Sequence, residues 1–574
     1  MNFRVWAPFA RRADLVVGEE PVAMIAVGGG WWEAEVGWAA AGTDYAYSLD
    51  GGPARPDPRS PWQPEGVHGP SRVVDHSAFA WTDEAWGGFH LPSAVLYELH
   101  VGTFTPDGTF RAAIEHLDHI VDLGVTAVEL LPVNAFPGAH GWGYDGVGLF
   151  APHAPYGGPD GLKALVDACH RRGLGVILDV VYNHLGPAGN HLGEYGPYFT
   201  DRYVTPWGQA VNLDGGGSEE VRRFFIDNAL GWLRDHHIDG LRIDAVHAIV
   251  DTSATHLLEE LVVEVARLAD ATGRPRWLIA ESELNDPRLI TSREAGGYGL
   301  DASWSDDFHH AVHALLTGER SGYYEDFGAV DDLLAALTEG YVYAGRHSAH
   351  RRRRHGRALP DVPATRLLGY AQNHDQVGNR ATGERLAHLV DDGLARVAAA
   401  LVLTAPFVPM LFHGEEWGAS TPFQYFTDHD DPELGRAVSE GRRREFAAFG
   451  WSPDDVPDPQ DPATFERSKL RWDEIERDPH ASLLAWHRAL IALRHAEPDL
   501  SDGRFVSAAG WDADAGWLRV ERGALTVELN LSDQLRRDHT ADGDLVLASH
   551  DDAALGPDGL ALPPRSVAIL RRTS

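Results

Sequence analysis

Two charged residues interrupt a segment that otherwise has the composition of a buried β-strand. In HIDGLRIDAVHAIV, residues 237–250, Leu241 and Ile243 are typical of a central parallel strand, yet Arg242 and Asp244 stand beside them. Side chains alternate along a strand, so residues two apart point to the same face. Because an unpaired buried charge is costly, we expect this face to look into a polar site where Arg242 keeps Asp244 ionised.

Polar residues end three other apolar segments in the same manner. They are Asp179, Asn183 and His184 in GVILDVVYNH, Glu281 in RWLIAES, and Asn373, His374 and Asp375 in LLGYAQNHD, while His247 follows Asp244 in its own segment. Taken singly, each residue has an ordinary structural explanation, such as a charge pair in a core, a hydrogen-bonded buried histidine or a helix cap. Their joint occurrence favours one site that contains three carboxylates.

This set of residues suits the cleavage of a glycosidic bond. Neither an HExxH zinc motif nor a GxSxG nucleophile motif occurs in the sequence. Glycoside cleavage needs one ionised carboxylate to attack the anomeric carbon and one carboxylic acid to protonate the leaving oxygen. We assign Asp244 to the first role and Glu281 to the second, because the apolar stretch WLIAE (277–281), which Glu281 ends, holds no cation. Asp375 is suited to holding sugar hydroxyls, and aromatic residues for stacking on sugar rings are Trp142, Tyr144, Tyr156 and Trp304.

A barrel of parallel strands would bring these segments to one mouth. Eight strand candidates alternate with helical patterns, and their ranges are 94–101, 125–133, 175–183, 239–246, 276–282, 300–306, 367–375 and 407–416. Strands that alternate with helices predict βαβ units and, with eight of them, a TIM barrel. In such a barrel the C-terminal strand ends surround the active site.

Short alternating segments separated by Gly and Pro clusters flank this region. The N-terminal part contains FRVWAP and TDYAYSLD, and the C-terminal part contains GWLRVERG and ALTVELNLS. Both patterns are typical of β-sandwiches. We therefore expect a multidomain protein with an N-terminal β-sandwich at 1–90, immunoglobulin-like as in carbohydrate-binding modules, a catalytic (β/α)8 barrel with insertions at 91–498, and a C-terminal β-sandwich at 499–574.

The composition excludes several classes of function. The 574 residues include 49 basic and 85 acidic ones, and the net charge of -36 disfavours nucleic acid or an anionic membrane as partner. The basic run at 351–354 is expected in a solvated loop or in local ion pairs. A single cysteine, Cys169, excludes an internal disulfide. Without a signal peptide or a bilayer-spanning apolar run, a cytoplasmic location is expected, while the oligomeric state is not indicated.

Four motifs resemble the signature regions of the α-amylase superfamily, glycoside hydrolase family 13. They are DVVYNH (179–184), GLRIDAVH (240–247), IAES (279–282) and NHDQ (373–376), in the order that the superfamily has. The resemblance implies a retaining enzyme with Asp244 as nucleophile, Glu281 as general acid/base and Asp375 as transition-state stabiliser, the two reacting carboxyls lying about 5 Å apart. The residues implied to line the subsite of the cleaved sugar are Tyr144, Asp179, His184, Arg242 and His374, and we add Trp142 and His247 as substrate-binding candidates.

Other stretches resemble one branch of this superfamily, the hydrolases that release trehalose from maltooligosyltrehalose. They are FRVWAPFA at the N-terminus, AESELND (280–286), NHDQVGNR (373–380), HGEEWG (413–418) and FTDHDDPELGRAVSEGRRREF (426–446). Asp286 and Asp428 belong to these stretches and are implied to bind substrate, Asp428 at the trehalose end. The implied reaction is hydrolysis of the α-1,4 bond that joins a maltooligosyl chain to a terminal trehalose unit.

Two alternatives stay open at this point. A branching enzyme of the same superfamily would pass the glycosyl unit to a sugar hydroxyl, although such enzymes usually have HDE where this chain has HDQ at 374–376. A catalytically inactive glycan-binding protein would be free to lose the three carboxylates, which are all present. We expect neither a metal nor a cofactor. Asn183 falls where calcium-binding amylases have a ligand, but the segment after it lacks a carboxylate cage, so a structural role is favoured.

Overall fold

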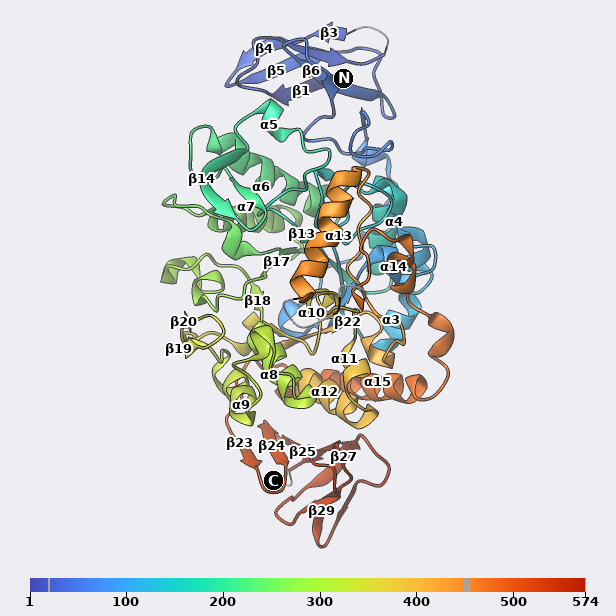
Figure 1. Ribbon diagram of the computed structural model, residues 1–574, viewed down its shortest axis with the longest axis vertical. Coiled ribbons are helices and arrows are strands. Elements are labelled where there is room, and N and C mark those ends of the chain that lie inside the picture. Colours follow the sequence, from blue (N-terminus) through green and yellow to red (C-terminus); the bar gives the residue numbers. More distant parts are fainter. Residues whose placement is uncertain (19–20, 448–451, 453–454, 573–574) are drawn as a thin grey trace.

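The computed structural model describes residues 1–18, 21–447, 452 and 455–572, and it has three parts along its long axis (Figure 1). Antiparallel sheets form the N-terminal end, a closed barrel with its helices forms the middle, and further antiparallel sheets form the C-terminal end. The predicted architecture, a central barrel between two β-rich flanking parts, is confirmed. The division at 90/91 and 498/499 remains our prediction; the first limit directly precedes the short helix η2 (Leu91–Ser93), and the second falls within the short helix η12 (Pro498–Leu500).

Eight parallel strands close the barrel. In spatial order they are β9 (Leu96–Leu99), β10 (Ala127–Leu130), β13 (Gly175–Val180), β16 (Gly240–Ile243), β17 (Trp277–Ala280), β18 (Ala302–Trp304), β21 (Leu367–Gly369) and β22 (Val408–Phe412), which pairs again with β9. Each observed strand lies within a range that the sequence predicts. The strands are buried almost throughout, because helices cover the outside of the barrel and side chains fill its inside.

Helices return the chain between the strands and shield the barrel. The longer ones are α4 (Gly158–His170), α6 (Ser218–Asp235), α7 (Leu257–Thr272), α8 (Asp306–Thr317), α9 (Val330–Glu339), α12 (Asp392–Thr404) and α15 (His480–Ala496). In α7, Leu258, Leu261 and Val265 recur at helical spacing and are buried, so one apolar stripe faces inward. Within the described ranges, no helix combines the length and the apolar character that a bilayer span requires.

Two main antiparallel sheets make up each flanking part. The N-terminal sheets contain β1 (Asn2–Trp6), β5 (Trp31–Glu35) and β4 (Ile25–Gly28), and β3 (Pro21–Ala23), β2 (Ala13–Val16), β6 (Asp44–Leu49) and β7 (Ala54–Arg55), with β8 (Ser71–Arg72) beside β6. The C-terminal sheets contain β23 (Ala509–Asp512), β24 (Trp517–Arg522), β25 (Leu525–Asn530), β30 (Ser566–Arg571) and β27 (Asp544–Ala548), and β26 (Arg536–Asp538), β29 (Gly559–Leu562) and β28 (Ala554–Gly556). Strand β25 is buried along its whole length because it is central in its sheet.

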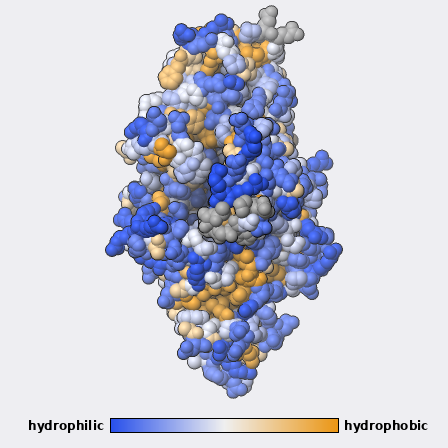
Figure 2. Space-filling model, viewed as in Figure 1, coloured by the Kyte–Doolittle hydropathy of each residue, from blue (hydrophilic) through white to orange (hydrophobic). Residues whose placement is uncertain are grey.

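Several insertions accompany the barrel. They include the hairpins of β11 (Asn134–Ala135) with β12 (Gly148–Pro152), of β14 (Phe199–Thr205) with β15 (Gly208–Val211) and of β19 (Ala344–Ser348) with β20 (Arg353–Gly356). A further one is α13 (Pro432–Ala447), drawn in orange in front of the barrel in Figure 1. The basic run lies in the β19–β20 hairpin, where Arg351 forms an ion pair over 2.6 Å with Glu283 of another loop. Figure 2 shows that hydrophilic side chains dominate this face of the molecule, as expected for a net charge of -36.

Candidate active site

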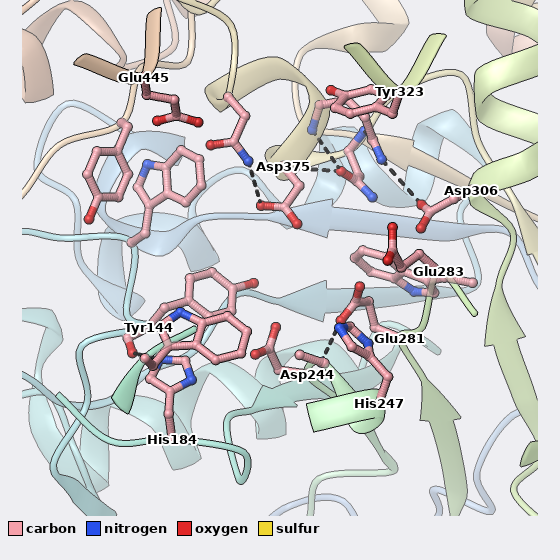
Figure 3. Close-up of a pocket in the computed structure, with 18 of the residues that line it drawn as sticks. Tyr144, His184, Asp244, His247, Glu281, Glu283, Asp306, Tyr323, Asp375 and Glu445 are labelled. Carbon is pink, nitrogen blue, oxygen red and sulfur yellow. Dashed lines mark hydrogen bonds between the residues drawn. The ribbon is translucent and has the colours of Figure 1, made fainter. Parts of the chain in front are cut away.

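A cavity of about 630 Å³ opens where the barrel strands end (Figure 3). The predicted site residues that line it are Trp142, Tyr144, His184, Asp244, His247, Glu281, Trp304, Asn373 and Asp375. Asp244 and Glu281 lie on one side of the space, and Asp375 faces them from the other side (Figure 3). The three carboxylates predicted from separate segments therefore meet around one space, which is large enough for sugar units.

Arg242 lies beneath this lining and pairs with two carboxylates. Its side chain is 0% exposed, and its Nη1 donates to Asp244 Oδ1 over 2.8 Å and to Asp179 Oδ2 over 2.7 Å. The guanidinium also lies over the Trp304 ring, 4.2 Å from the centroid. Burial disfavours the cation, but the carboxylate of Asp179 and its neighbours raise the pKa of Arg242 above its ordinary value. The two charges in GLRIDAV are thus paired with each other at the edge of the cavity.

Glu281 follows β17 and lies beside the same guanidinium. Its Oε2 is 3.8 Å from Arg242 Nη2 and accepts a hydrogen bond from the Ala245 N–H over 2.5 Å. Burial raises the pKa of Glu281 to about 8, although Arg242 acts against this rise and Asp244 adds to it. The acid form is therefore favoured at neutral pH. The nearby cation belongs to the neighbouring strand, so the sequence of β17 alone does not reveal it.

Ala245 has an unusual backbone conformation between Asp244 and His247. Its φ of +39° lies in the left-handed region, which residues other than glycine rarely adopt. This conformation accompanies the hydrogen bond from its N–H to Glu281 and begins the turn η4 (Val246–Ala248), which brings His247 to the cavity wall. The strained turn thus connects the candidate nucleophile to the candidate acid.

Asp179 and His374 also lie beneath the lining, where Tyr144 connects them. The Tyr144 hydroxyl donates to Asp179 Oδ2 over 2.6 Å and lies 2.7 Å from His374 Nε2. On its other side, His374 Nδ1 faces Glu98 Oε1 at 2.5 Å. Burial disfavours the imidazolium, but the Glu98 carboxylate outweighs it and raises the pKa of His374 to about 9. His374 can therefore donate from both ring nitrogens. Glu98 on β9, which lies beneath the residues that line the cavity, was not predicted from the sequence.

His184 and Trp207 form an aromatic wall of the cavity. Their rings stack with centroids 4.6 Å apart, and Trp207, from the β14–β15 hairpin, stays 48% exposed. Asn183, beside His184, donates through Nδ2 to Asp244 Oδ2 over 2.7 Å and to the Asp244 carbonyl over 2.9 Å. Asn183 thus holds the backbone and the carboxylate of the candidate nucleophile. In the described part of the chain, no group of three or more His, Cys, Asp or Glu is arranged to hold a metal ion.

Asp375 reaches the cavity from a helix instead of a strand. Strand β21 ends at Gly369, and Asp375 lies in the first turn of α10 (His374–Gly378). Asn373 caps this helix by accepting the Asp375 N–H over 2.9 Å, which ends the extended backbone earlier than the sequence predicts. The side chain of Asp375 is 46% exposed and lies 3.7 Å from His374 Nε2, so it is open to a ligand.

Two predicted substrate-binding residues lie away from the lining. Asp286 precedes the turn η5 (Pro287–Leu289), accepts the Arg288 N–H over 3.1 Å and pairs with the Arg288 guanidinium. Asp428 accepts the Ala139 N–H over 2.7 Å. Asp286 thus holds the backbone of its own turn, Asp428 holds the backbone of a segment far away in the sequence, and neither is among the described residues that line the cavity. Tyr156, considered for stacking, is also buried away from it, with its hydroxyl 3.1 Å from His100 Nε2.

Residues that follow the second, fifth, sixth, seventh and eighth barrel strands, together with residues of the β14–β15 hairpin and α13, complete the lining. Those that sequence reasoning missed include Asp145, Trp207, Glu283, Asp306, His310, Tyr323, Asn379, Tyr425, Arg442 and Glu445. Asp306 begins α8 two residues after β18 ends, so the rule that polar residues gather at strand ends would have found it. Arg442 and Glu445 on α13 carry no such signal, because a charge that faces substrate and one that faces water look alike in a sequence.

The geometry supports bond cleavage by two carboxyl groups in opposite protonation states. Asp244, hydrogen-bonded to Arg242, is suited to attack, and Glu281, with its pKa raised to about 8, is suited to donate a proton. A thiol nucleophile is disfavoured, because Cys169 is buried and burial raises its pKa far above the neutral range.

Parts of the chain match two known families. Residues 76–195 match the Alpha-amylase family, described as the alpha amylase catalytic domain, and residues 503–569 match the Domain of unknown function (DUF3459). In fold, the chain matches a crystal structure from Salmonella typhimurium, described as an alpha amylase, with a TM-score of 0.90, 39% identity and coverage of 100% of this chain and 97% of the other. A pullulanase from Paenibacillus barengoltzii, at 21% identity with a TM-score of 0.72 and coverage of 100% and 93%, shares the fold.

Relatives of known name are similar over the full length. The malto-oligosyltrehalose trehalohydrolase of Arthrobacter ramosus is 54% identical, with 99% of each chain covered. The protein of the same name from Mycobacterium tuberculosis (strain ATCC 25618 / H37Rv) is 50% identical, again with 99% of each chain covered. That from Saccharolobus solfataricus is 43% identical, covering 96% of this chain and 94% of the relative. The chain therefore belongs to the family of malto-oligosyltrehalose trehalohydrolases.

Proposed function

We propose that this protein hydrolyses the α-1,4-glucosidic bond next to the terminal trehalose unit of maltooligosyltrehalose and releases trehalose and a maltooligosaccharide. The observation that carries the proposed chemistry is the placement of Asp244 and Glu281 around one buried guanidinium, that of Arg242, at a single cavity. The choice of substrate is supported by the activity named for relatives that are 54% and 50% identical to this chain.

In the first step, the Asp244 carboxylate attacks the anomeric carbon of the glucose unit that precedes trehalose. The bond from this carbon to the trehalose oxygen breaks, and Glu281 gives its proton to that oxygen, so trehalose leaves with a free hydroxyl group. The maltooligosyl chain remains as an ester on Asp244. Arg242 and Asn183 hold the carboxylate in position for the attack.

In the second step, Glu281 acts as a carboxylate and removes a proton from water. The water oxygen attacks the same carbon, the ester bond to Asp244 breaks, and the maltooligosaccharide leaves as its α-anomer because two inversions give retention. In this proposal Tyr144, His184 and His374 surround the attacked glucose, and Asp375 binds its hydroxyls from the opposite side. Asp286 and Asp428 stay predicted substrate-binding residues outside this arrangement, with Asp286 accepting the Arg288 N–H and Asp428 the Ala139 N–H.

Product analysis on two substrates tests the proposal. The protein is incubated separately with maltooligosyltrehalose and with amylose, and the products are separated by chromatography and followed by NMR before mutarotation. We expect trehalose and an α-anomeric maltooligosaccharide from the first substrate. New α-1,6 branches without release of trehalose would instead establish the branching activity. Absence of turnover on any α-glucan would establish a glycan-binding protein.

A further inference from the structure

Asp306 is a further carboxylate of the cavity, and one of its oxygens has no partner among the described residues. Its Oδ1 accepts hydrogen bonds from the Tyr370 hydroxyl over 2.7 Å and from Gln376 Nε2 over 3.5 Å. Nothing in the described ranges donates to its Oδ2, while Asp306 itself lines the cavity. The next residue, Asp307, differs, because its Oδ2 accepts three hydrogen bonds from neighbouring backbone and amide groups. Asp306 is thus a fixed acceptor with one oxygen available to a ligand.

The position of Asp306 places it on the side of the leaving group. A general acid must contact the oxygen of the breaking bond, so the leaving sugar extends on the side of Glu281 and away from the attacked ring. In Figure 3, Tyr144 lies to one side of Asp244, whereas Glu281 and Asp306 lie to the other side. Asp306 is also close enough to contribute to the raised pKa of Glu281. A departing trehalose unit would therefore pass along Asp306.

Gln376 influences the charge of Asp306. Gln376 Oε1 accepts the Asn373 N–H over 2.9 Å, so its donor end is the one that faces Asp306. A glutamate at this position would keep the same cap but would place a second carboxyl 3.5 Å from Asp306. Two carboxyls so close do not both ionise easily near neutral pH. The glutamine in the HDQ motif thus allows Asp306 to stay ionised.

An ionised Asp306 is suited to bind a polyol. Burial raises the pKa of Asp306 to about 6, with the hydrogen bond from Tyr370 acting against the rise, so the carboxylate predominates at neutral pH and above. Trehalose has no reducing end and presents hydroxyl groups, which donate charge-assisted hydrogen bonds to a carboxylate. The neighbouring Glu283 differs because its carboxylate is paired with Arg351 over 2.6 Å.

We propose that Asp306, held by Tyr370 and Gln376, is a specificity-determining residue that binds the hydroxyl groups of the departing trehalose unit. The inference rests on the proposed function and identifies the part of the cavity that recognises trehalose. It separates this end of the site from the Tyr144 end, where the maltooligosyl chain stays attached to Asp244.

Inhibition by the product tests the inference directly. In Asp306→Asn, the inhibition constant of trehalose should rise about tenfold to a hundredfold, because a neutral amide replaces the charged acceptor. The matched control is Glu325→Gln, which removes the same charge from an exposed side chain near Tyr323 and should leave the constant unchanged. Equal trehalose inhibition in the wild type and in folded Asp306→Asn would overturn the inference. A wild type that releases no trehalose would instead refute the proposed function itself.

Gln376→Glu gives a second test that keeps the helix cap. It should weaken trehalose inhibition to a similar extent, because the two neighbouring carboxyls then share a proton. The double variant Asp306→Asn with Gln376→Glu exchanges the acid and the amide. Its affinity for trehalose should therefore fall by less than the sum of the losses, in free energy, of the two single variants. Additive losses, or trehalose inhibition unchanged in Gln376→Glu, would contradict the inference. Thermal unfolding midpoints of all three variants check that each is folded. If Asp306→Asn does not fold, trehalose inhibition of Gln376→Glu alone tests the inference.

Discussion

The guanidinium of Arg242 donates a hydrogen bond of 2.8 Å to the Asp244 carboxylate, and both residues come from one barrel segment. The pair explains why two charges occur in an otherwise apolar sequence. Arg242 fills the space beneath the cavity with its own side chain fully buried, while Asp244 reaches the surface of the cavity. The strand therefore carries the site on one face and its packing residues, Leu241 and Ile243, on the other.

Substitution of Arg242 should separate catalysis from stability. Arg242→Ala leaves the buried carboxylate of Asp179 without its cation, and loss of a partner from a buried pair costs about 3 to 5 kcal/mol of unfolding free energy. Arg242→Lys keeps the charge but not the planar fork that contacts several carboxylates. We expect kcat/KM of Arg242→Lys to fall about a hundredfold to a thousandfold with a smaller loss of stability. Steady-state kinetics and urea unfolding check both, and near wild-type kinetics in Arg242→Lys would contradict the assigned role.

The raised pKa of Glu281 predicts the basic limb of the pH profile. Because the acid form must donate a proton, kcat/KM should fall as the pH rises through about 8. The same profile can be compared between the wild type and Asp306→Asn. Removal of this neighbouring negative charge lowers the pKa of Glu281, so the basic limb of kcat/KM should move to lower pH in the variant. A profile that stays flat up to pH 10 would exclude Glu281 as the acid.

Glu281→Gln should lose activity according to how much the leaving group needs a proton. On maltooligosyltrehalose, kcat should fall about a hundredfold to ten-thousandfold, the usual contribution of general acid catalysis. On α-maltosyl fluoride, the attack on the anomeric carbon needs no proton donor, so formation of the ester on Asp244 should be much less affected. Single-turnover kinetics on both substrates measure the difference. Equal losses on the two would indicate a structural role for Glu281.

The residues at the strand ends could be predicted from the sequence, because side chains alternate along a strand and the C-terminal ends of parallel strands meet at one mouth. Arg242 and Asp244 are two residues apart on a strand, and Asp179 lies opposite Arg242 on the neighbouring strand, so both pairs follow from alternation and parallel pairing. The same reasoning brings Glu281 to the same mouth. All eight barrel strands lie where their apolar runs predict them, because a strand buried on both faces needs such a run.

Loops and insertions could not be placed in this way. Trp207 reaches the cavity only because the β14–β15 hairpin folds back onto His184, a contact that no local pattern encodes. Proximity in sequence to Glu281 does not by itself fix the place of a side chain, since Asp286, five residues later, pairs with Arg288. Asp375 is in the cavity although the extended backbone ends sooner than predicted, because the cap at Asn373 redirects the chain.

Asp244→Asn should remove turnover and keep binding. The amide is nearly isosteric and can still accept from Arg242, whose charge stays paired with Asp179, so the cavity should retain its shape. Without an anionic nucleophile, the ester intermediate cannot form. Calorimetry with maltooligosyltrehalose measures the affinity, and trehalose release measures the turnover. Turnover close to that of the wild type would place the nucleophile elsewhere.

His170 lies between two buried carboxylates, those of Asp83 and Asp239, near the N-terminal end of β16 and thus away from the cavity. Its Nδ1 donates to Asp83 over 2.9 Å and its Nε2 donates to Asp239 over 2.9 Å, so both ring nitrogens carry protons. Burial disfavours this imidazolium, but the hydrogen bonds that His170 donates to the two carboxylates raise its pKa above the ordinary value. His237 and Arg274 also face Asp83, so this carboxylate keeps partners when His170 is neutral.

The stability that His170 provides should therefore depend on pH. Because its pKa is raised in the folded state, the contribution is complete below the unfolded pKa of about 6.5 and is lost as the pH rises through the folded value. His170→Gln should lower the free energy of unfolding by about 1 to 3 kcal/mol at pH 6 and by less at pH 9. Urea unfolding followed by tryptophan fluorescence measures both, with the exposed His347→Gln as control. A deficit that is equal at the two pH values would mean that His170 is neutral in the folded protein.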